Sequence, residues 1–165
     1  MKTTTINLYD YKELDEKARA KALSNWNEDN DFPFLEECML ESLSEQLQKE
    51  KIEPIKEKIT YSLGYSQGDG AMFYGSYKWK GYDVEIQHSG NYSHSYSKTI
   101  RIEKGEKEAS EKTYKQFEAI FQNICKTLEK YGYDVIEQEQ SEENFIETCE
   151  ANEYTFESDG TMRNA

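Results

Sequence analysis

Residues 57–103 alternate between apolar and polar side chains. A period of two is typical of β-strands that bury one face and expose the other. Lys80-Gly81 has the composition of a two-residue hairpin turn. The cross-strand pairs that this turn predicts place all eight residues on one face: Trp79–Tyr82, Tyr77–Val84, Gly75–Ile86 and Phe73–His88. A slip by one residue would turn the aromatic side chains outward, so the register is strongly specified.

The next strand follows by the same argument. With residues 89–93 as a loop, His88 faces His94 and Ile86 faces Tyr96, again on one face. An earlier strand over Ile59–Leu63 completes the sheet. We therefore expect a four-stranded antiparallel meander over about residues 57–103.

The flanking segments have helical periodicity. Apolar residues recur every three or four positions over about 13–28, 32–49, 106–131 and 141–151. Gly132 stands where the glycine that ends a helix is commonly found. The chain is therefore expected to form a single α+β domain, residues 1–165, with helices packed on one face of the sheet.

Two glycine-rich and polar loops are expected at one end of this sheet. Strand directions alternate in a meander, so loops 64–70 and 88–94 leave the sheet on the same side. Glycine permits close backbone approach to a ligand, and rigidly supported loops commonly carry binding groups. The candidate ligand-binding residues are Ser66, Gln67, Gly68, Asp69, Gly70, His88, Tyr92 and His94.

Three interpretations of these loops remain open. They can be structural turns with hydrogen-bonded histidines, or a surface that binds a ligand or partner. They can also be a metal or acid–base site built from His88, His94 and Asp69. The H-x5-H spacing is no recognised zinc motif, and Gly68-Asp69-Gly70 is too short for a phosphate-binding loop. We expect no catalytic residue, metal or cofactor.

The charge of the chain is unevenly distributed. The net charge is −13, which opposes binding to a nucleic-acid backbone and favours a basic protein partner. Residues 134–165 contain ten acids and one base, so this acidic C-terminal subregion alone carries −9. It is expected to be packed on the domain or appended to it. Either it is a solvated face, or its glutamates bind a partner: Glu137, Glu139, Glu142, Glu143 and Glu147.

The sequence also indicates a cytoplasmic protein. No apolar leader follows Met1-Lys2, and no stretch approaches the roughly 20 apolar residues of a membrane span. The three cysteines, Cys38, Cys125 and Cys149, are odd in number and far apart. Such spacing is typical of reduced thiols in the cytosol.

Four segments resemble a family of small acidic proteins encoded by bacteriophages and prophages. The central one is YSQGDGAMFYG at 65–75, similar to the family's "SQGDGA-x-F-x-G". The others are the helix at 11–23, HSGNYSH at 88–94 and ANEYTFESDG at 151–160. The family is loosely labelled an antitoxin of a toxin–antitoxin stability system. The resemblance implies a phage accessory protein in the cytoplasm of the bacterial host, and it assigns no catalytic residue.

These observations favour a non-enzymatic inhibitor that binds and blocks a host defence or toxin protein. Its acidic surface could imitate nucleic acid against a basic groove. The alternative is a protein that binds or sequesters a small nucleotide signal with loops 64–70 and 88–94. A metal-assisted hydrolase is the third hypothesis. The expected partner is a host protein with a basic surface, with no direct contact to nucleic acid or membrane.

Overall fold

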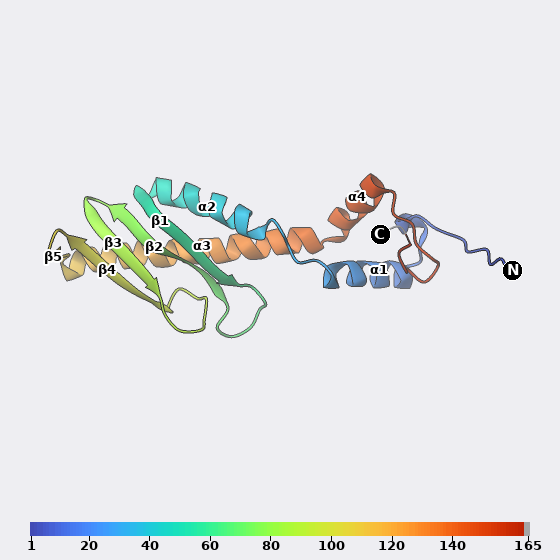
Figure 1. Cartoon of the computed structure of the whole chain (residues 1–165), viewed down its shortest axis with the longest axis horizontal. Helices are drawn as coiled ribbons and strands as arrows, with labels where there is room; N and C mark the ends of the chain where they lie inside the picture. Colours follow the sequence, from blue (N-terminus) through green and yellow to red (C-terminus); the bar gives the residue numbers. More distant parts are fainter. Residues whose placement is uncertain (164–165) are drawn as a thin grey trace. The chain divides into compact units, whose positions relative to one another are not determined.

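The computed structural model describes residues 1–163 and has an α+β fold, as the alternation predicts (Figure 1). Its elements, in chain order, are η1 (Tyr11–Glu13), α1 (Glu16–Glu28), α2 (Leu35–Lys49), β1 (Ile52–Ser62), β2 (Gly70–Trp79), β3 (Tyr82–His88), β4 (Lys98–Lys104), β5 (Lys107–Glu108), α3 (Glu111–Gln140) and α4 (Glu142–Asn152). Within residues 1–163, no helix has the length and apolar character needed to cross a membrane.

The expected single domain divides into two compact units. Unit 1 contains residues 1–33 and 136–165, and unit 2 contains residues 34–135. The boundary falls inside α3. The acidic C-terminal segment therefore forms a compact unit with the N-terminal segment. Unit 1 has sixteen acids and six bases, a net charge of −10, and unit 2 has seventeen acids and fourteen bases, a net charge of −3.

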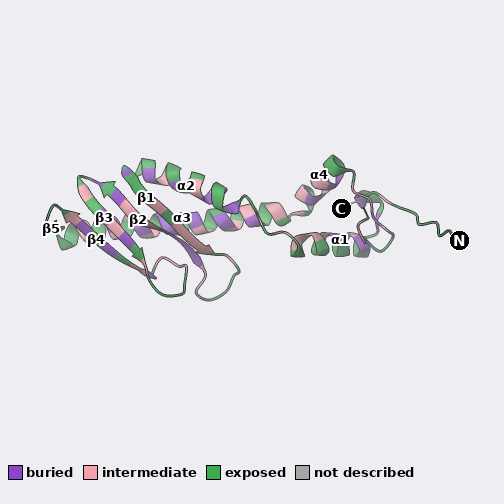
Figure 2. Cartoon of the chain, in the orientation of Figure 1, coloured by how far each residue is buried: buried purple, intermediate pink, exposed green. Residues whose placement is uncertain are grey.

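Unit 2 is built on an antiparallel meander in the order β1-β2-β3-β4-β5. The pairs predicted for the β2–β3 hairpin are confirmed from Trp79–Tyr82 to Gly75–Ile86. The ladder ends there, short of the predicted Phe73–His88 pair. Buried and exposed residues alternate along β3 and β4, as Figure 2 shows. The face with Phe73 and Trp79 packs on α3, with ring centroids 4.9 Å apart for Phe73–Phe121 and 5.2 Å for Trp79–Phe117.

The sheet is larger than predicted at both edges. β1 begins at Ile52 and contains Pro54. The register shifts at a bulge between Pro54 and Lys56, and this irregularity accommodates the proline. Proline lacks the N–H that a central strand must donate, so its place on an edge strand at a bulge is physically consistent. At the other edge, β5 pairs with β4 over residues expected to be helical. The helix begins only after Ser110, whose hydroxyl accepts from the backbone N–H of Thr113 at 3.3 Å.

Gly132 does not end the third helix, because α3 continues to Gln140. Its role is close packing instead. A Cβ added to Gly132 would lie 2.5 Å from Cδ1 of Leu63 and 3.3 Å from Cε of Met39. Leu63 follows β1 and Met39 lies in α2, so the missing side chain lets both approach the backbone of α3.

Unit 1 has a separate aromatic core. Helix α1 begins after Asp15, whose carboxylate accepts from the backbone N–H of Ala18 at 2.8 Å. Helix α4 begins after Ser141, which accepts from the backbone N–H of Asn144. Between these helices and the terminal segments lie the buried core residues Tyr11, Leu14, Ala18, Ala22, Phe145, Cys149 and Phe156.

Candidate functional site

The two loops of the predicted site meet in space. They connect β1 to β2 and β3 to β4 and lie next to each other in Figure 1. A Cβ added to Gly68, where φ is +89°, would lie 2.5 Å from Cδ1 of Tyr92. A Cβ added to Gly70 would lie 2.7 Å from Cα of His94. These two glycines therefore let one loop pack directly against the other.

Asp69 organises the first loop. Its Oδ1 accepts from the hydroxyl of Ser62 at 2.7 Å. Its Oδ2 accepts from the backbone N–H groups of Gly64 at 2.7 Å and Ser66 at 2.9 Å. The N–H of Ser66, the hydroxyl of Ser62 and the N–H of Gly64 together hold the pKa of Asp69 below its usual value. This carboxylate is engaged by its own loop, whereas the side chains of Ser66 and Gln67 are exposed.

We predict a pH dependence of this loop. Because the folded pKa of Asp69 is lowered, its stabilising contribution is complete above the unfolded value, near 3.8, and is lost as the pH falls through the folded pKa. Amide exchange of Gly64 and Ser66 should accelerate over that range. NMR measurements on the Asp69→Asn variant should show fast exchange of both amides at every pH. A wild-type loop with exchange independent of pH, after correction for intrinsic rates, would contradict this assignment.

The second loop is longer than predicted. His88 pairs with Lys98 rather than His94, and Ile86 pairs with Ile100 rather than Tyr96. The loop therefore covers residues 89–97, closed by a bond from Ser89 N–H to the carbonyl of Ser97 at 2.8 Å. The predicted parity is still correct, because the register differs from the expectation by an even number of residues.

Both histidines are held by this loop. His88 Nε2 lies 2.7 Å from the carbonyl oxygen of Tyr92, and His94 Nδ1 lies 3.4 Å from the hydroxyl of Ser97. Within residues 1–163, no group of three or more His, Cys, Asp or Glu side chains is placed to hold a metal ion. His88, His94 and Asp69 therefore do not form the ligand set that the hydrolase hypothesis requires.

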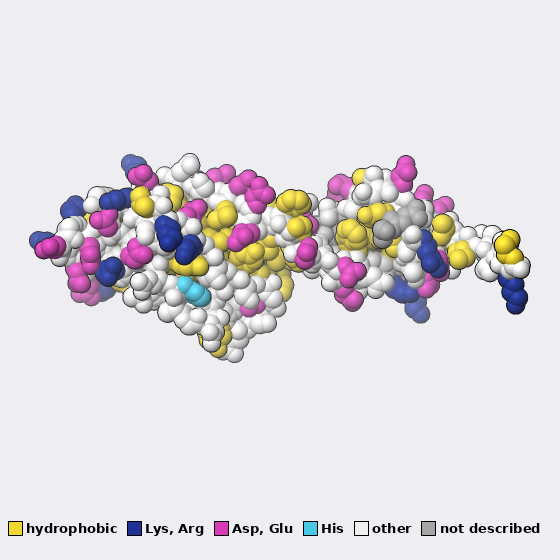
Figure 3. Space-filling model, in the orientation of Figure 1, with side chains coloured by type: hydrophobic (Ala, Val, Ile, Leu, Met, Phe, Trp, Pro, Cys, Tyr) yellow, Lys and Arg dark blue, Asp and Glu magenta, His cyan; other side chains and the backbone are white. Residues whose placement is uncertain are grey.

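The loops present exposed aromatic side chains. Tyr65 is 71% exposed, Tyr92 57% and Tyr96 78%. Tyr92 stacks on His94 with ring centroids 5.4 Å apart, and Tyr65 stacks on Tyr133 of α3 at 4.4 Å. We call Tyr65, Tyr92, His94 and Tyr96, with segments 63–69 and 89–97, the loop surface. Segments 63–69 and 89–97 contain one Asp, Asp69, and no Glu, Lys or Arg. This end of the sheet shows few charged side chains in Figure 3.

Sequence reasoning missed two of these tyrosines. Tyr96 was expected on the apolar face of the last strand, and Tyr65 was placed in the first loop but given no binding role. The signal that could have found them is composition. Segment 89–97, SGNYSHSYS, contains only Ser, Gly, Asn, Tyr and His, in a chain where 32% of residues are charged.

The candidate acidic residues are not equivalent. Glu137, Glu142, Glu143 and Glu147 are exposed, and Glu139 is half-buried. Glu142 has a structural role, since its Oε1 accepts from the hydroxyl of Tyr11 at 2.9 Å. The pKa of Tyr11 is raised, mainly by burial and to a smaller extent by this hydrogen bond. A variant that neutralises Glu142 would therefore disturb the core of unit 1 as well as its surface charge.

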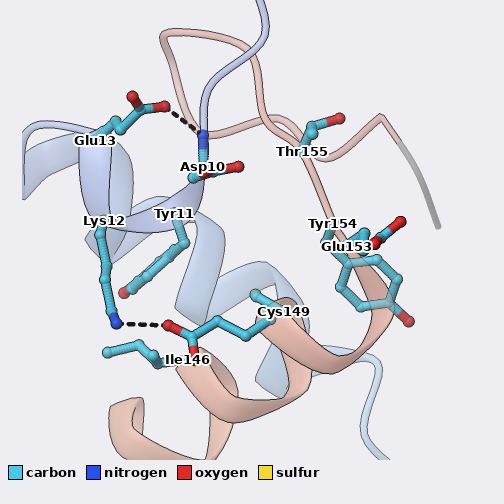
Figure 4. A pocket seen from close by; sticks show the side chains of 10 residues that line it. Asp10, Tyr11, Lys12, Glu13, Ile146, Cys149, Glu153, Tyr154 and Thr155 are labelled. Carbon is cyan, nitrogen blue, oxygen red and sulfur yellow. Dashed lines mark hydrogen bonds and ion pairs between the residues drawn. The ribbon is translucent and has the colours of Figure 1, made fainter.

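A hollow of about 500 Å³ lies within unit 1, where no site was predicted (Figure 4). Figure 4 shows the side chains of η1 on one side and those that follow α4 on the other. The ten lining residues are Asp10, Tyr11, Lys12, Glu13, Ile146, Cys149, Glu150, Glu153, Tyr154 and Thr155. They come from opposite ends of the chain, so no local sequence pattern predicts the hollow.

Comparison with known proteins gives no assignment for these features. No protein-family model, curated protein or solved structure matches this chain.

Proposed function

We propose that this chain is a non-enzymatic binding protein that binds a protein partner through the loop surface. The observation that carries the proposal is the exposure of Tyr65, Tyr92 and Tyr96 on two nearly uncharged loops. Protein interfaces are enriched in tyrosine and depleted of lysine, glutamate and aspartate at their centres. Tyrosine is also among the residues that contribute most of the binding energy.

The composition of the loops supports this assignment. Antibody paratopes combine tyrosine with serine, glycine and asparagine for a physical reason. Tyrosine supplies a large contact area and has few rotatable bonds, and the small polar residues supply adaptable hydrogen bonds. Segments 63–69 and 89–97 have the same combination.

The loops are also held in place before any partner binds. Asp69 fixes the first loop through three hydrogen bonds, and Gly68 packs under the ring of Tyr92. Gln122 of α3 donates to the carbonyl of Ser95 at 3.2 Å, which ties the second loop to the helix. Ordering a loop on binding costs affinity, so a surface ordered in advance binds more tightly.

The exposure of the tyrosines favours a protein over a small molecule. Small ligands are usually held in concave sites that bury most of their surface. Side chains more than half exposed, as here, are suited to a broad protein surface. The proposed partner is a host defence or toxin protein, in line with the family resemblance, and the net charge of −13 favours encounter with a basic one.

Capture from a bacterial host lysate tests this proposal, followed by affinity measurement on the purified partner. The variant is the double substitution Tyr65→Ser and Tyr96→Ser. We expect it to weaken binding by about tenfold to a hundredfold, the usual cost of removing interface tyrosines. Exchange of the Gly64 and Ser66 amides as slow as in the wild type verifies that the first loop remains folded.

Two controls separate the loop surface from other causes. Phe34→Ser removes an aromatic side chain that is 65% exposed outside the loops, and it should leave binding unchanged. Glu143→Gln with Glu147→Gln tests the acidic surface, and should slow association and reduce its salt dependence without changing dissociation. If the glutamate variant abolishes binding and the tyrosine variant does not, the proposal is wrong and the acidic surface is the partner site.

A further inference from the structure

The hollow in unit 1 has an apolar floor. Tyr11 and Cys149 are buried there, and Ile146 and Tyr154 are half-buried. The pKa of the Cys149 thiol is raised to about 11, mainly by burial and also by the neighbouring charge of Glu150. The floor therefore carries no charge at neutral pH. A surface of this kind is stabilised by contact with hydrocarbon rather than with water.

The rim of the hollow is acidic. Asp10, Glu13, Glu150 and Glu153 contribute carboxylates, and Lys12 is the one base among the described lining residues. The lining therefore has a net charge of −3, inside a unit that carries −10. Both charges disfavour a phosphate or carboxylate ligand and favour a cation.

The contacts across the rim leave room for such a cation. Glu150 Oε1 lies 2.5 Å from Nζ of Lys12, in a pair whose side chains are 62% and 64% exposed. Exposed pairs of this kind contribute about 0–1 kcal/mol, so rearranging this one costs little. Glu13 Oε2 accepts from the backbone N–H of Asp10 at 2.8 Å. Each carboxylate has about four lone-pair positions and can accept further bonds.

We infer that this hollow binds an arginine side chain from an exposed segment of a partner protein. The planar guanidinium can pair with the carboxylate of Glu150, and its fork of N–H donors matches carboxylate geometry. The methylene stem can cover Ile146 and Cys149 on the floor. Tyr154, on the far side of the hollow from Lys12 in Figure 4, adds aromatic surface against which the partner segment can pack.

NMR titration of the complete 165-residue chain tests the inference, with N-acetyl-arginine amide as the probe. N-acetyl-citrulline amide is the matched control, because its urea group has a similar shape and no charge. We expect amide shifts at Lys12, Cys149, Glu150 and Tyr154 with a roughly millimolar dissociation constant, as fits a single side chain. The citrulline probe should bind at least about tenfold more weakly, a difference of about 1.4 kcal/mol.

Two variants on α4 locate the site. Glu150→Gln should weaken arginine binding about tenfold, and Glu147→Gln, which changes the same charge outside the lining residues, less than about twofold. Equal binding of the two probes, equal effects of the two variants, or no shift at these four amides would each overturn the inference. The inference concerns unit 1 and is independent of the loop surface in unit 2, so either can fail without the other.

Discussion

Replacing Gly75 with alanine is expected to destabilise unit 2 by about 4 kcal/mol, at the upper end of single-residue effects. Gly75 lies in β2, paired with Glu57 of β1 next to the bulge, with φ at +109°. A Cβ at this position would lie 1.9 Å from the carbonyl oxygen of Lys56. Backbone atoms cannot move aside as a flexible side chain can, so the pairing of β1 with β2 must break near the bulge. Urea denaturation followed by circular dichroism measures the loss.

Gly90→Ala is the matched control. Gly90 also has a positive φ, +78°, but an added Cβ would meet no atom within 4 Å. This variant should cost only the strain of a left-handed conformation, about 1 kcal/mol. The difference between the two variants isolates the collision with Lys56. Equal costs for both would mean that the close approach at the bulge is not what requires glycine at position 75.

The sheet was predictable where side-chain alternation and turn chemistry agree. Lys80-Gly81 fixed the β2–β3 pairing from Trp79–Tyr82 to Gly75–Ile86. The β3–β4 register was not predictable in the same way, because period two is satisfied by any even displacement. The choice is made by contacts distant in sequence. Ser95 is bonded to Gln122 of α3, and Gly70 of β2 packs against His94.

The proximity of the two loops was predicted correctly, whereas the contacts that their residues make were not. Strand alternation correctly brought loops 64–70 and 88–94 together, but the function of individual residues depended on geometry. Asp69 was proposed as a ligand-binding residue, and the structure shows its carboxylate accepting from Ser62, Gly64 and Ser66. Glycines 68 and 70 were assigned to close approach of a ligand, and they accommodate Tyr92 and His94 instead.

Phe145→Ala should destabilise unit 1 by about 4 kcal/mol, the usual cost of deleting a buried phenylalanine. Phe145 is 0% exposed. Its ring lies 5.0 Å from that of Tyr11 and 6.2 Å from that of Phe156, both edge-on, and it stacks on Trp26 at 5.4 Å. The deletion leaves a cavity in the middle of this cluster, and Tyr11, which lines the hollow, loses its support.

The two tryptophans allow this effect to be assigned to one unit. Trp26 belongs to unit 1 and Trp79 to unit 2, so fluorotryptophan labelling gives one fluorine NMR signal from each. In Phe145→Ala, the Trp26 signal should reach its unfolded position at a lower urea concentration, whereas the Trp79 signal should follow the wild type. Phe34→Ala deletes a phenylalanine that is 65% exposed. It should change the free energy of unfolding reported by either signal by no more than about 0.5 kcal/mol. If both signals moved together in Phe145→Ala, the two units would unfold as one cooperative domain, because only a shared transition transmits the loss of one core to the other.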